Sequence, residues 1–253
     1  MPWFRGENAP NPRLTRQIVR ELLTDEQHGS VAWDLPVQDA PYFVIDIETS
    51  GFSPQTDIVL SIASATLRLP NLDLDCEGTP NTHLAPEPQT IPEPELWQNL
   101  EYALIGLRDT SIVPSCIWQL TGLTPESLVQ GRDWREVLLE TLKRAGGAVW
   151  VAHHARHELS FLQNSARDFW RLRLHPIVID TALVAQALVG HPQIPTLDEV
   201  CTWLDVPIGK RHQADEDVRM TALVWQKEAK LCQALGLSTV GQVIEWARAR
   251  AEG

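Results

Sequence analysis

The chain has 253 residues, of which 43% are hydrophobic and 21% are charged. This composition is typical of a globular protein and too apolar for a disordered chain, so we expect a fold with a sizeable core. No run approaches the roughly 18 apolar residues of a transmembrane helix, and the first residues lack the apolar core of a signal peptide, which predicts a cytoplasmic protein. The four cysteines form no CxxC pair, which argues against a zinc knuckle, a redox motif or a disulfide scaffold.

The formal net charge is −12, and the acidic residues are unevenly distributed along the chain. Residues 41–110 contain 11 acidic and two basic residues, whereas the segments on either side are close to balanced. Such a charge at first argues against nucleic acid as a partner, because phosphate binding normally needs basic groups. The concentration of the acids in one segment weakens this objection.

The first predicted element is a helix from Leu14 to about Gln27, where apolar residues recur at helical spacing after a proline suited to a first turn. A linker is expected through residues 34–41. The runs Tyr42–Ile47 and Ile58–Leu69 are apolar and separated by turn residues, so they predict a hairpin of buried strands.

Residues 70–131 are rich in proline and polar residues, and we expect a third strand near His83–Leu84 followed by irregular structure. Beyond this segment, helices and strands alternate. The expected elements are a helix at Trp134–Arg144, a strand at Ala148–Ala152, a helix at Arg156–Phe169, a strand at Ile177–Ile179, and helices at Thr181–Leu188, Thr196–Leu204, Ala214–Leu235 and Thr239–Arg250. Strands followed by βα units predict an α/β fold with a mixed β-sheet flanked by helices.

The most informative carboxylates are Asp46 and Glu48, at the end of the first predicted strand. Side chains two residues apart on a strand face the same side, so both acids point to one place. They repel one another unless a cation neutralises them, and hard oxygen ligands favour Mg²⁺ or Mn²⁺. An isolated D-x-E pair can also be nothing more than two solvated strand-end residues.

Two further clusters follow along the chain. Glu158 lies in the segment Val151–Leu162, where a predicted buried strand passes into a helix, and the segment Lys210–Asp217 begins another helix. Each cluster is a weak signal when taken alone.

Together these segments resemble the motifs of the DEDDh family of 3′→5′ exonucleases, the DnaQ-like branch of the RNase H-like fold. DIETSG at Asp46–Gly51 is similar to the family's first motif, D-x-E-T-x-G. AHHARHELSFL at Ala152–Leu162 is similar to the second, A-H-N-A-x-F-D-x-x-F-L, and His212–Asp217 matches the third, H-x-A-x-x-D. IWQLTGLTPESL at Ile117–Leu128 looks like the family's connecting I-x-x-x-x-G-I-T segment. The resemblance covers about residues 41–235.

The resemblance implies an RNase H-like mixed sheet flanked by helices, in an exonuclease domain at residues 41–235. The elements predicted outside it are an N-terminal helical extension and linker at residues 1–40 and a C-terminal helix at 236–253. The implied activity is metal-dependent 3′→5′ hydrolysis of phosphodiester bonds, with release of nucleoside monophosphates. The implied partners are single-stranded or frayed 3′ ends of DNA or RNA. A polymerase or repair complex is a further candidate partner, and no membrane is implied.

By position, the resemblance implies that Asp46, Glu48, Glu158 and Asp217 hold two divalent ions, Mg²⁺ or Mn²⁺, with His212 as general base. The chemistry agrees, because hydrolysis needs a hydroxide at neutral pH and a counter-charge for the leaving 3′ oxygen, and two ions supply both. A neutral imidazole can take the proton of a water at physiological pH. Considered alone, His212 could equally be a plain residue at the start of a helix.

Two residues depart from the family pattern. Glu158 stands where the family usually has Asp, and His154 stands where it usually has Asn. Glu is one methylene longer, so it can reach a metal directly or through a water, but the fine geometry of the site would differ. The alternative for Glu158 is a solvent-facing residue on a helix.

Thr49, Gly51 and Phe52 follow the first motif, where members of the family let the backbone approach the terminal nucleotide and place an apolar side chain against its base. Stacking tolerates any base, which suits a trimming enzyme. Phe52 could equally be a core residue.

Three basic residues are candidates for contacts with the phosphate backbone. Lys210 and Arg211 immediately precede the third motif, and Arg156 lies near the second. Solvation of a surface would explain these charges almost as well.

Two functions from other classes compete with the exonuclease reading. His153 and His157 have a spacing that can bind zinc on a helix, as in a zinc-dependent hydrolase, but the helix is expected to begin after His153 and no H-E-x-x-H pattern is present. The departures at Glu158 and His154 also leave open a catalytically degenerate exonuclease fold that serves as a binding module. A preference for DNA or RNA has no signature in this sequence.

Overall fold

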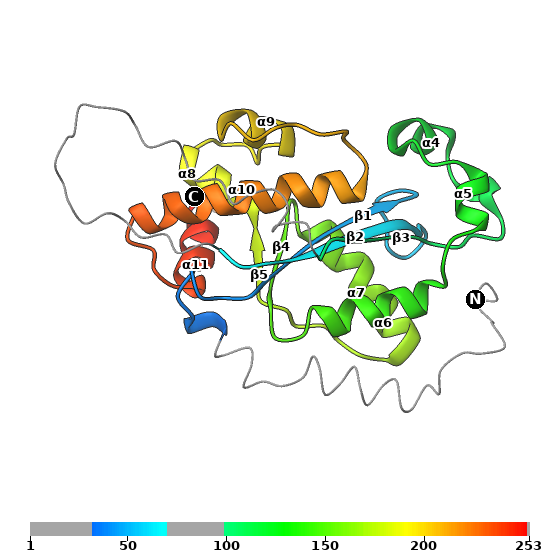
Figure 1. Cartoon of the computed structure of the whole chain (residues 1–253), viewed down its shortest axis with the longest axis horizontal. Coiled ribbons are helices and arrows are strands. Elements are labelled where there is room, and N and C mark those ends of the chain that lie inside the picture. The colour runs from blue at the N-terminus through cyan, green and yellow to red at the C-terminus, as the bar shows by residue number, and fades with distance from the viewer. Residues whose placement is uncertain (1–31, 70–98, 252–253) are drawn as a thin grey trace.

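The computed structural model describes residues 32–69 and 99–251, in which five strands form one sheet (Figure 1). The elements are β1 (Tyr42–Thr49), β2 (Val59–Leu67), β3 (Glu101–Leu104), the 3-10 helix η1 (Thr110–Ile112), α4 (Ser115–Thr121), α5 (Pro125–Val129), α6 (Trp134–Arg144), β4 (Val149–Ala152), α7 (Arg156–Trp170), β5 (Val178–Asp180), α8 (Thr181–Val189), α9 (Leu197–Trp203), α10 (Ala214–Ala234) and α11 (Val240–Ala251). The strand order is β3-β2-β1-β4-β5.

The central strand β1 determines where the carboxylates lie. It pairs antiparallel with β2, so that Asp46 is opposite Ala63 and Glu48 is opposite Ser61, and it pairs parallel with β4. The register with β2 shifts between Glu48 and Thr49. Such irregularities re-aim side chains and end regular pairing, and here the irregularity follows directly after the two acids.

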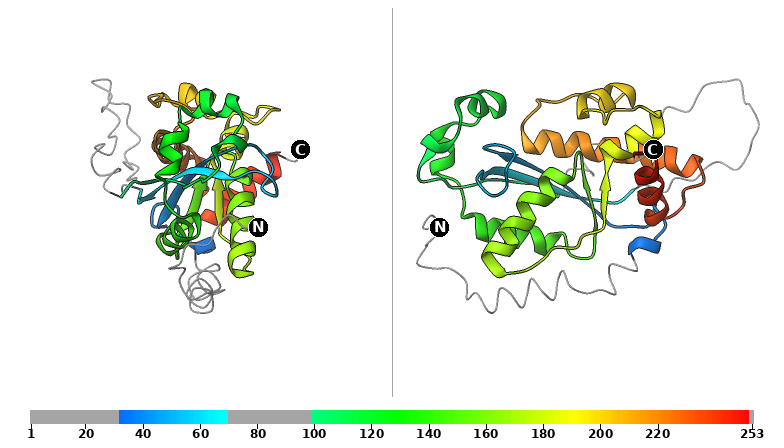
Figure 2. Two further views of the ribbon diagram at one scale, coloured as in Figure 1. Left: turned by 90° about the vertical axis from the view of Figure 1, so that its right-hand side faces the viewer. Right: turned by 180° about the vertical axis from the view of Figure 1, so that it is seen from behind.

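The sheet separates two hydrophobic layers. Tyr42 and Val44 of β1 face a core formed with α8, α10 and α11, whereas Phe43 and Ile45 face a core formed with α6 and α7. Figure 2, in the view from behind, shows α10 along one side of the sheet and α6 and α7 on the other. Because side chains alternate along a strand, Asp46 and Glu48 continue the side of Tyr42 and Val44, which faces α10.

The predicted mixed sheet flanked by helices is confirmed. The predicted hairpin is β1 and β2, and the βα units from residue 134 onward lie within two residues of their predicted bounds. These segments have long apolar patterns, which are the most reliable signal of secondary structure. The expected C-terminal helix is α11, whose Val240, Val243 and Ile244 pack into the core shared with α8 and α10.

The expectation of irregular structure up to residue 131 is wrong in the described part of that segment, which contains β3, α4 and α5. These elements have four, seven and five residues, too few to show a hydrophobic period. A capping box defines α5 instead, since Thr124 Oγ1 accepts from Ser127 N at 3.2 Å and Ser127 Oγ accepts from Thr124 N at 3.2 Å. The helix expected at Leu14–Gln27 and the strand expected near His83–Leu84 lie outside the described residues.

The described part of the expected N-terminal linker packs against the C-terminal helix. Pro36 and Thr239 form a β-bridge, and the Tyr42 hydroxyl donates to the Val37 carbonyl at 2.5 Å. A side chain at Gly241 would collide with the Trp33 ring, so glycine is needed there for this close approach. Within residues 32–69 and 99–251, no helix is long and apolar enough to cross a bilayer.

Candidate active site

The strand β1 presents two carboxylates on one side of the sheet, as the sequence predicts. The side chains of Tyr42 to Ile45 are buried, and Asp46 and Glu48 are the partly exposed positions at the end of the strand. Both acids face the layer that contains α10. The carboxyl of Asp46 is within electrostatic range of three other carboxylates, so it is not an isolated strand-end residue.

Helix α10 brings the third motif to these acids. Asp217, in its first turn, is 4% exposed, and its Oδ2 accepts from the backbone N–H of His212 at 3.2 Å. The potential ligand atoms of Glu48, His212 and Asp217 all lie within 4.8 Å of one another. The structure therefore brings together residues more than 160 positions apart, from the first and third motifs.

Helix α7 contributes the fourth carboxylate. Glu158 lies in its first turn, just after β4, and is 4% exposed, so the solvent-facing alternative is wrong. Its Oε2 is buried and has no hydrogen-bond partner among the described residues. A buried, unpartnered carboxylate oxygen beside other acids is costly in a neutral environment, and it fits a ligand to a cation.

The electrostatics of the cluster show how strongly these acids oppose one another. Burial raises the pKa of Asp46 well above its ordinary value, and the charges of Glu158, Asp217 and Glu48 raise it further, while Arg211 opposes them. Burial likewise raises the pKa of Glu48 to about 7, with Asp217 adding to the rise and Arg211 opposing it. Hard divalent cations suit such a set of oxygen ligands and would reverse these shifts.

Two histidines at the site have left-handed backbone conformations. The φ angle is 59° at His154 and 60° at His212, a region where Asn, Asp and His are the most common residues other than glycine. This explains physically why His can replace the family's usual Asn at position 154. At His212 the conformation aims the backbone N–H at Asp217, and such conformations cluster at functional sites.

Asp180 is a site residue that the sequence analysis missed. It caps α8 by accepting from Ala182 N at 3.1 Å, and it also accepts from the backbone N–H groups of His154 at 3.1 Å and Ala155 at 3.0 Å. It therefore holds the turn that leads into α7, and its charge raises the pKa of Glu158 after the larger effect of burial. An Asp between a strand and a helix signals an N-cap, but no sequence pattern indicates its bonds to a turn 25 residues earlier.

The structure does not form a zinc site from His153 and His157. His153 is 7% exposed, and its two ring nitrogens lie 2.9 Å from Thr181 Oγ1 and 3.2 Å from the Pro195 carbonyl. Burial lowers the pKa of His153 to about 3, which keeps the ring neutral. The ring of His157 instead lies 3.3 Å from Thr49 Oγ1, and α7 begins after His153.

A cleft of about 210 Å³ lies directly beside Glu48 and His212. Its wall includes Tyr102 of β3 and Leu123, which follows α4. Sequence reasoning missed Tyr102, because β3 is too short to recognise, whereas Leu123 lies in the connecting segment that resembles the family's. The cleft offers aromatic and apolar surface within reach of the carboxylates.

The residues after the first motif have separate roles. Thr49 is buried, and its hydroxyl donates to the Gly51 carbonyl at 2.6 Å. A side chain at Gly51 would come within 2.5 Å of the Asp57 carboxylate, so glycine is required for packing of this turn. Phe52 is 90% exposed, which excludes the core alternative, and its ring lies 5.9 Å from that of His157.

The three basic candidates do not form one patch. Arg211 pairs with Asp217 and, at 2.6 Å, with Asp198. The Lys210 ammonium lies next to Gly122 at the end of α4. Arg156 lines a different hollow of about 520 Å³, together with residues of α7, β5, α8 and α11.

Part of the chain matches a known family of nucleases. Residues 105–225 match the family model RNase_T, described as an exonuclease, and this range contains Glu158, His212 and Asp217. The chain is therefore similar to this exonuclease family over slightly less than half of its length. The first motif, with Asp46 and Glu48, precedes the matched range.

Curated relatives of this chain include much longer polymerases. The PolC-type DNA polymerase III of Caldanaerobacter subterraneus subsp. tengcongensis is 24% identical over 222 residues, which cover 88% of this chain and 13% of the polymerase. That of Thermotoga maritima is 25% identical over 226 residues, which cover 89% of this chain and 14% of the polymerase. The chain thus spans only 13–14% of the length of these relatives.

Solved structures agree with the fold. E. coli exonuclease I, in a zinc-bound complex with single-stranded DNA, matches with a TM-score of 0.56 at 15% identity, over 79% of this chain and 42% of that chain. Cell-death related nuclease 4 matches with a TM-score of 0.53 at 14% identity, over 80% of this chain and 67% of that chain. The chain therefore shares the RNase H-like fold of these nucleases.

Proposed function

We propose that this chain is a two-metal-ion exonuclease that removes nucleotides from the 3′ ends of single-stranded or frayed DNA or RNA and releases nucleoside monophosphates. The observation that carries the proposal is the convergence of four carboxylates, Asp46, Glu48, Glu158 and Asp217, beside His212. The orphaned Oε2 of Glu158 and the mutual repulsion of the acids fit a cation site. When bound there, two Mg²⁺ or Mn²⁺ ions would supply a hydroxide at neutral pH and charge for the leaving oxygen.

Residues of the chain itself would accept the proton and position the carboxylates that bind the ions. His212 would accept the proton of the attacking water, because a nitrogen of its ring lies within 4.8 Å of carboxylate oxygens of Glu48 and Asp217. Its backbone N–H holds Asp217, so one turn positions both the base and a ligand. Asp180 fixes the turn before α7, and thereby the start of the helix that carries Glu158.

The surroundings of the carboxylates favour an unpaired 3′ end. The cleft beside Glu48 has an aromatic and an apolar wall, from Tyr102 and Leu123, and the exposed ring of Phe52 follows the first motif, so both surfaces could stack on bases. The basic residues near the site are few and scattered, which predicts weak binding of duplex. The similar exonuclease I, solved with single-stranded DNA, also supports this substrate class.

The decisive experiment uses 5′-labelled single-stranded DNA and RNA of the same sequence, with Mg²⁺ or Mn²⁺ and with EDTA. We expect a ladder of shortened labelled products with either ion, and none with EDTA. Asp46→Asn keeps the shape of the side chain and removes its charge, so it is the matched inactive variant. Early release of the label as a mononucleotide would reverse the direction, and digestion that persists both in EDTA and in Asp46→Asn would overturn the two-ion site.

Comparison of the DNA and RNA rates in this assay decides the preferred nucleic acid. Tight binding of the single strand without any products would instead favour a degenerate binding module.

The PolC-type relatives motivate a polymerase or repair complex as partner, and a cytoplasmic location remains a prediction. Co-purification with a polymerase from cells that express the tagged chain tests the partner.

A further inference from the structure

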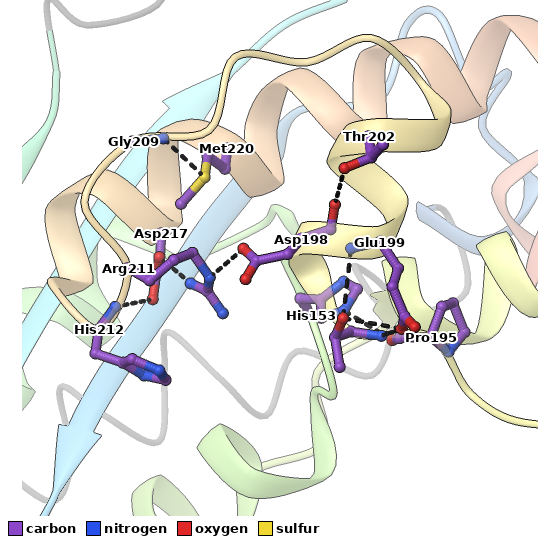
Figure 3. A network of polar contacts seen from close by, with 11 residues as sticks. His153, Pro195, Asp198, Glu199, Thr202, Gly209, Arg211, His212, Asp217 and Met220 are labelled. Carbon is purple, nitrogen blue, oxygen red and sulfur yellow. Dashed lines mark hydrogen bonds and ion pairs between the residues drawn. The ribbon is translucent and has the colours of Figure 1, made fainter. Parts of the chain in front are cut away.

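Arg211 links the candidate ion site to a carboxylate outside it. One end of its guanidinium pairs with Asp217, and its Nε lies 2.6 Å from Oδ1 of Asp198, in the first turn of α9 (Figure 3). The Arg211 side chain is 25% exposed and that of Asp217 only 6%, whereas that of Asp198 is 51% exposed. The guanidinium therefore spans the boundary between the buried carboxylates and the surface.

The charge of Arg211 acts on more than its direct partner. It opposes the rise of pKa at Asp46 and at Glu48, in addition to Asp217. Arg211 is thus a counter-cation for three of the four proposed ion ligands. A guanidinium is always charged and presents donors on several sides, so it can hold two carboxylates at once.

Asp198 is held in place independently of Arg211. Its helix, α9, begins with a capping box in which Thr196 N donates to Glu199 Oε2 at 2.8 Å. The residue before this cap, Pro195, is contacted through its carbonyl by the His153 ring at 3.2 Å. Figure 3 shows this start of α9 lying between the second motif, at His153, and the third, at Arg211.

We propose that Arg211, tethered by Asp198, is a built-in counter-cation that holds Asp217 in place and competes with divalent ions for its carboxylate. This inference rests on the proposed two-ion function, because it takes Asp217 to be an ion ligand. Arg211 keeps one carboxylate partner, Asp198, when an ion takes the other. Asp198 is therefore a positioning residue, which acts on the ion site through Arg211 without touching it.

The proposal makes opposite predictions for the two states of the site. Without ions, Arg211→Gln leaves the acids without their counter-charge, so the midpoint of thermal unfolding should fall. With ions, the same variant frees Asp217, so the affinity for Mn²⁺ should rise by on the order of tenfold, as expected when a partly buried ion pair need not be broken. Arg211→Lys keeps the positive charge but lacks the several donors of the guanidinium. Its unfolding midpoint and its affinity for Mn²⁺ should therefore lie between those of Arg211→Gln and the wild type.

The test is isothermal titration of the full chain with Mn²⁺, together with thermal unfolding in EDTA. Arg132→Gln is the matched control, because Arg132 forms an exposed ion pair with Glu140 at 2.8 Å and takes no part in the site. Asp198→Asn should weaken Mn²⁺ binding several-fold, since Arg211 then pairs with Asp217 alone. In the Arg211→Gln background the same change should have little effect, because Asp198 acts through Arg211.

An unchanged or weaker Mn²⁺ affinity in Arg211→Gln would overturn the competition. An equal effect of Asp198→Asn in both backgrounds would show a long-range charge effect and overturn the positioning role. If the wild type binds neither Mn²⁺ nor Mg²⁺, the proposed two-ion function fails. In that case the unfolding midpoint in EDTA still decides whether Arg211 stabilises the acids, because an unchanged midpoint in Arg211→Gln excludes it.

Discussion

Replacement of Glu48 by Gln should stabilise the protein without ions and destabilise it relative to the wild type with ions. Glu48 ionises against burial and against the charge of Asp217, which together raise its pKa to about 7. Gln has nearly the same shape and no charge. The substitution therefore removes the repulsion that the folded protein contains and, at the same time, a proposed ligand.

The size of this effect follows from the rise of the pKa from its ordinary value of 4.5 to about 7. Between these values the folded protein binds more protons than the unfolded chain, so the free energy of unfolding falls as pH rises through this window. At about 1.4 kcal/mol for each pH unit, ionised Glu48 costs the folded state at most about 3 kcal/mol at pH 8. For a protein of this size, that corresponds to roughly 6–12 °C in Tm.

The assay is thermal unfolding of the wild type and Glu48→Gln at pH 5, 6, 7 and 8, in EDTA and in saturating Mn²⁺. In EDTA, the advantage of the variant should be small at pH 5 and grow to several degrees at pH 8. With Mn²⁺ the order should reverse, because only the wild type gains the stabilisation that ligand binding provides. Glu140→Gln is the control, since this half-exposed residue pairs with Arg132 and is not part of the site.

The reasoning is refuted if Glu48→Gln, folded by circular dichroism, is no more stable than the wild type in EDTA at pH 8. Solvent or an unrecognised partner would then stabilise the ionised carboxylate of Glu48 in the folded protein. An equal gain in Glu140→Gln would attribute the effect to the net charge of −12 instead of the site.

Three further predictions test the remaining roles. Glu158→Gln should lose far more nuclease activity than Glu158→Asp, which keeps the charge, and equal near-wild-type rates would exclude a ligand role. His212→Ala should lower turnover by about 10²–10⁴ while Mn²⁺ titration shows little change in affinity, and a loss within about threefold would exclude a general base. Asp180→Ala should lower the free energy of unfolding by about 1–3 kcal/mol, because three backbone N–H groups lose their acceptor, and denaturant titration with an unchanged midpoint would contradict this.

The elements of the fold that can be predicted from the sequence are those with long hydrophobic patterns. Tyr42 to Ile45 form a continuous apolar run and Ile47 follows Asp46, a pattern expected of a strand that is buried on both faces, and β1 is that strand. The segment Glu101–Leu104 offers no such signal, because it is four residues long and begins with an exposed acid. Its place at the edge of the sheet depends on pairing with Ser61–Ser64 of β2, which is a tertiary contact.

The residues of the candidate site also fall into those that the sequence can place and those that it cannot. Asp46 and Glu48 could be placed on one face from strand alternation alone, and the third motif could be placed at a helix start. These segments come together only because β1 pairs parallel with β4 and α10 packs across the sheet. Asp180 and Tyr102 were missed because their relevance comes only from what the fold brings beside them, Asp180 at the turn before α7 and Tyr102 in the cleft wall.

The two departures from the family pattern have different physical consequences. At position 154 the structure requires a left-handed backbone whose N–H reaches Asp180, and His meets this requirement as Asn does, so that change is conservative for the backbone. At position 158 the longer Glu keeps its charge, is buried and leaves one oxygen without a protein partner. A protein that had abandoned ion binding would gain stability by replacing this residue with a neutral one, because a buried, unpaired carboxyl opposes folding. In the proposed function an ion compensates the repulsion among the four acids, and their presence at such a cost favours an active site over a degenerate one.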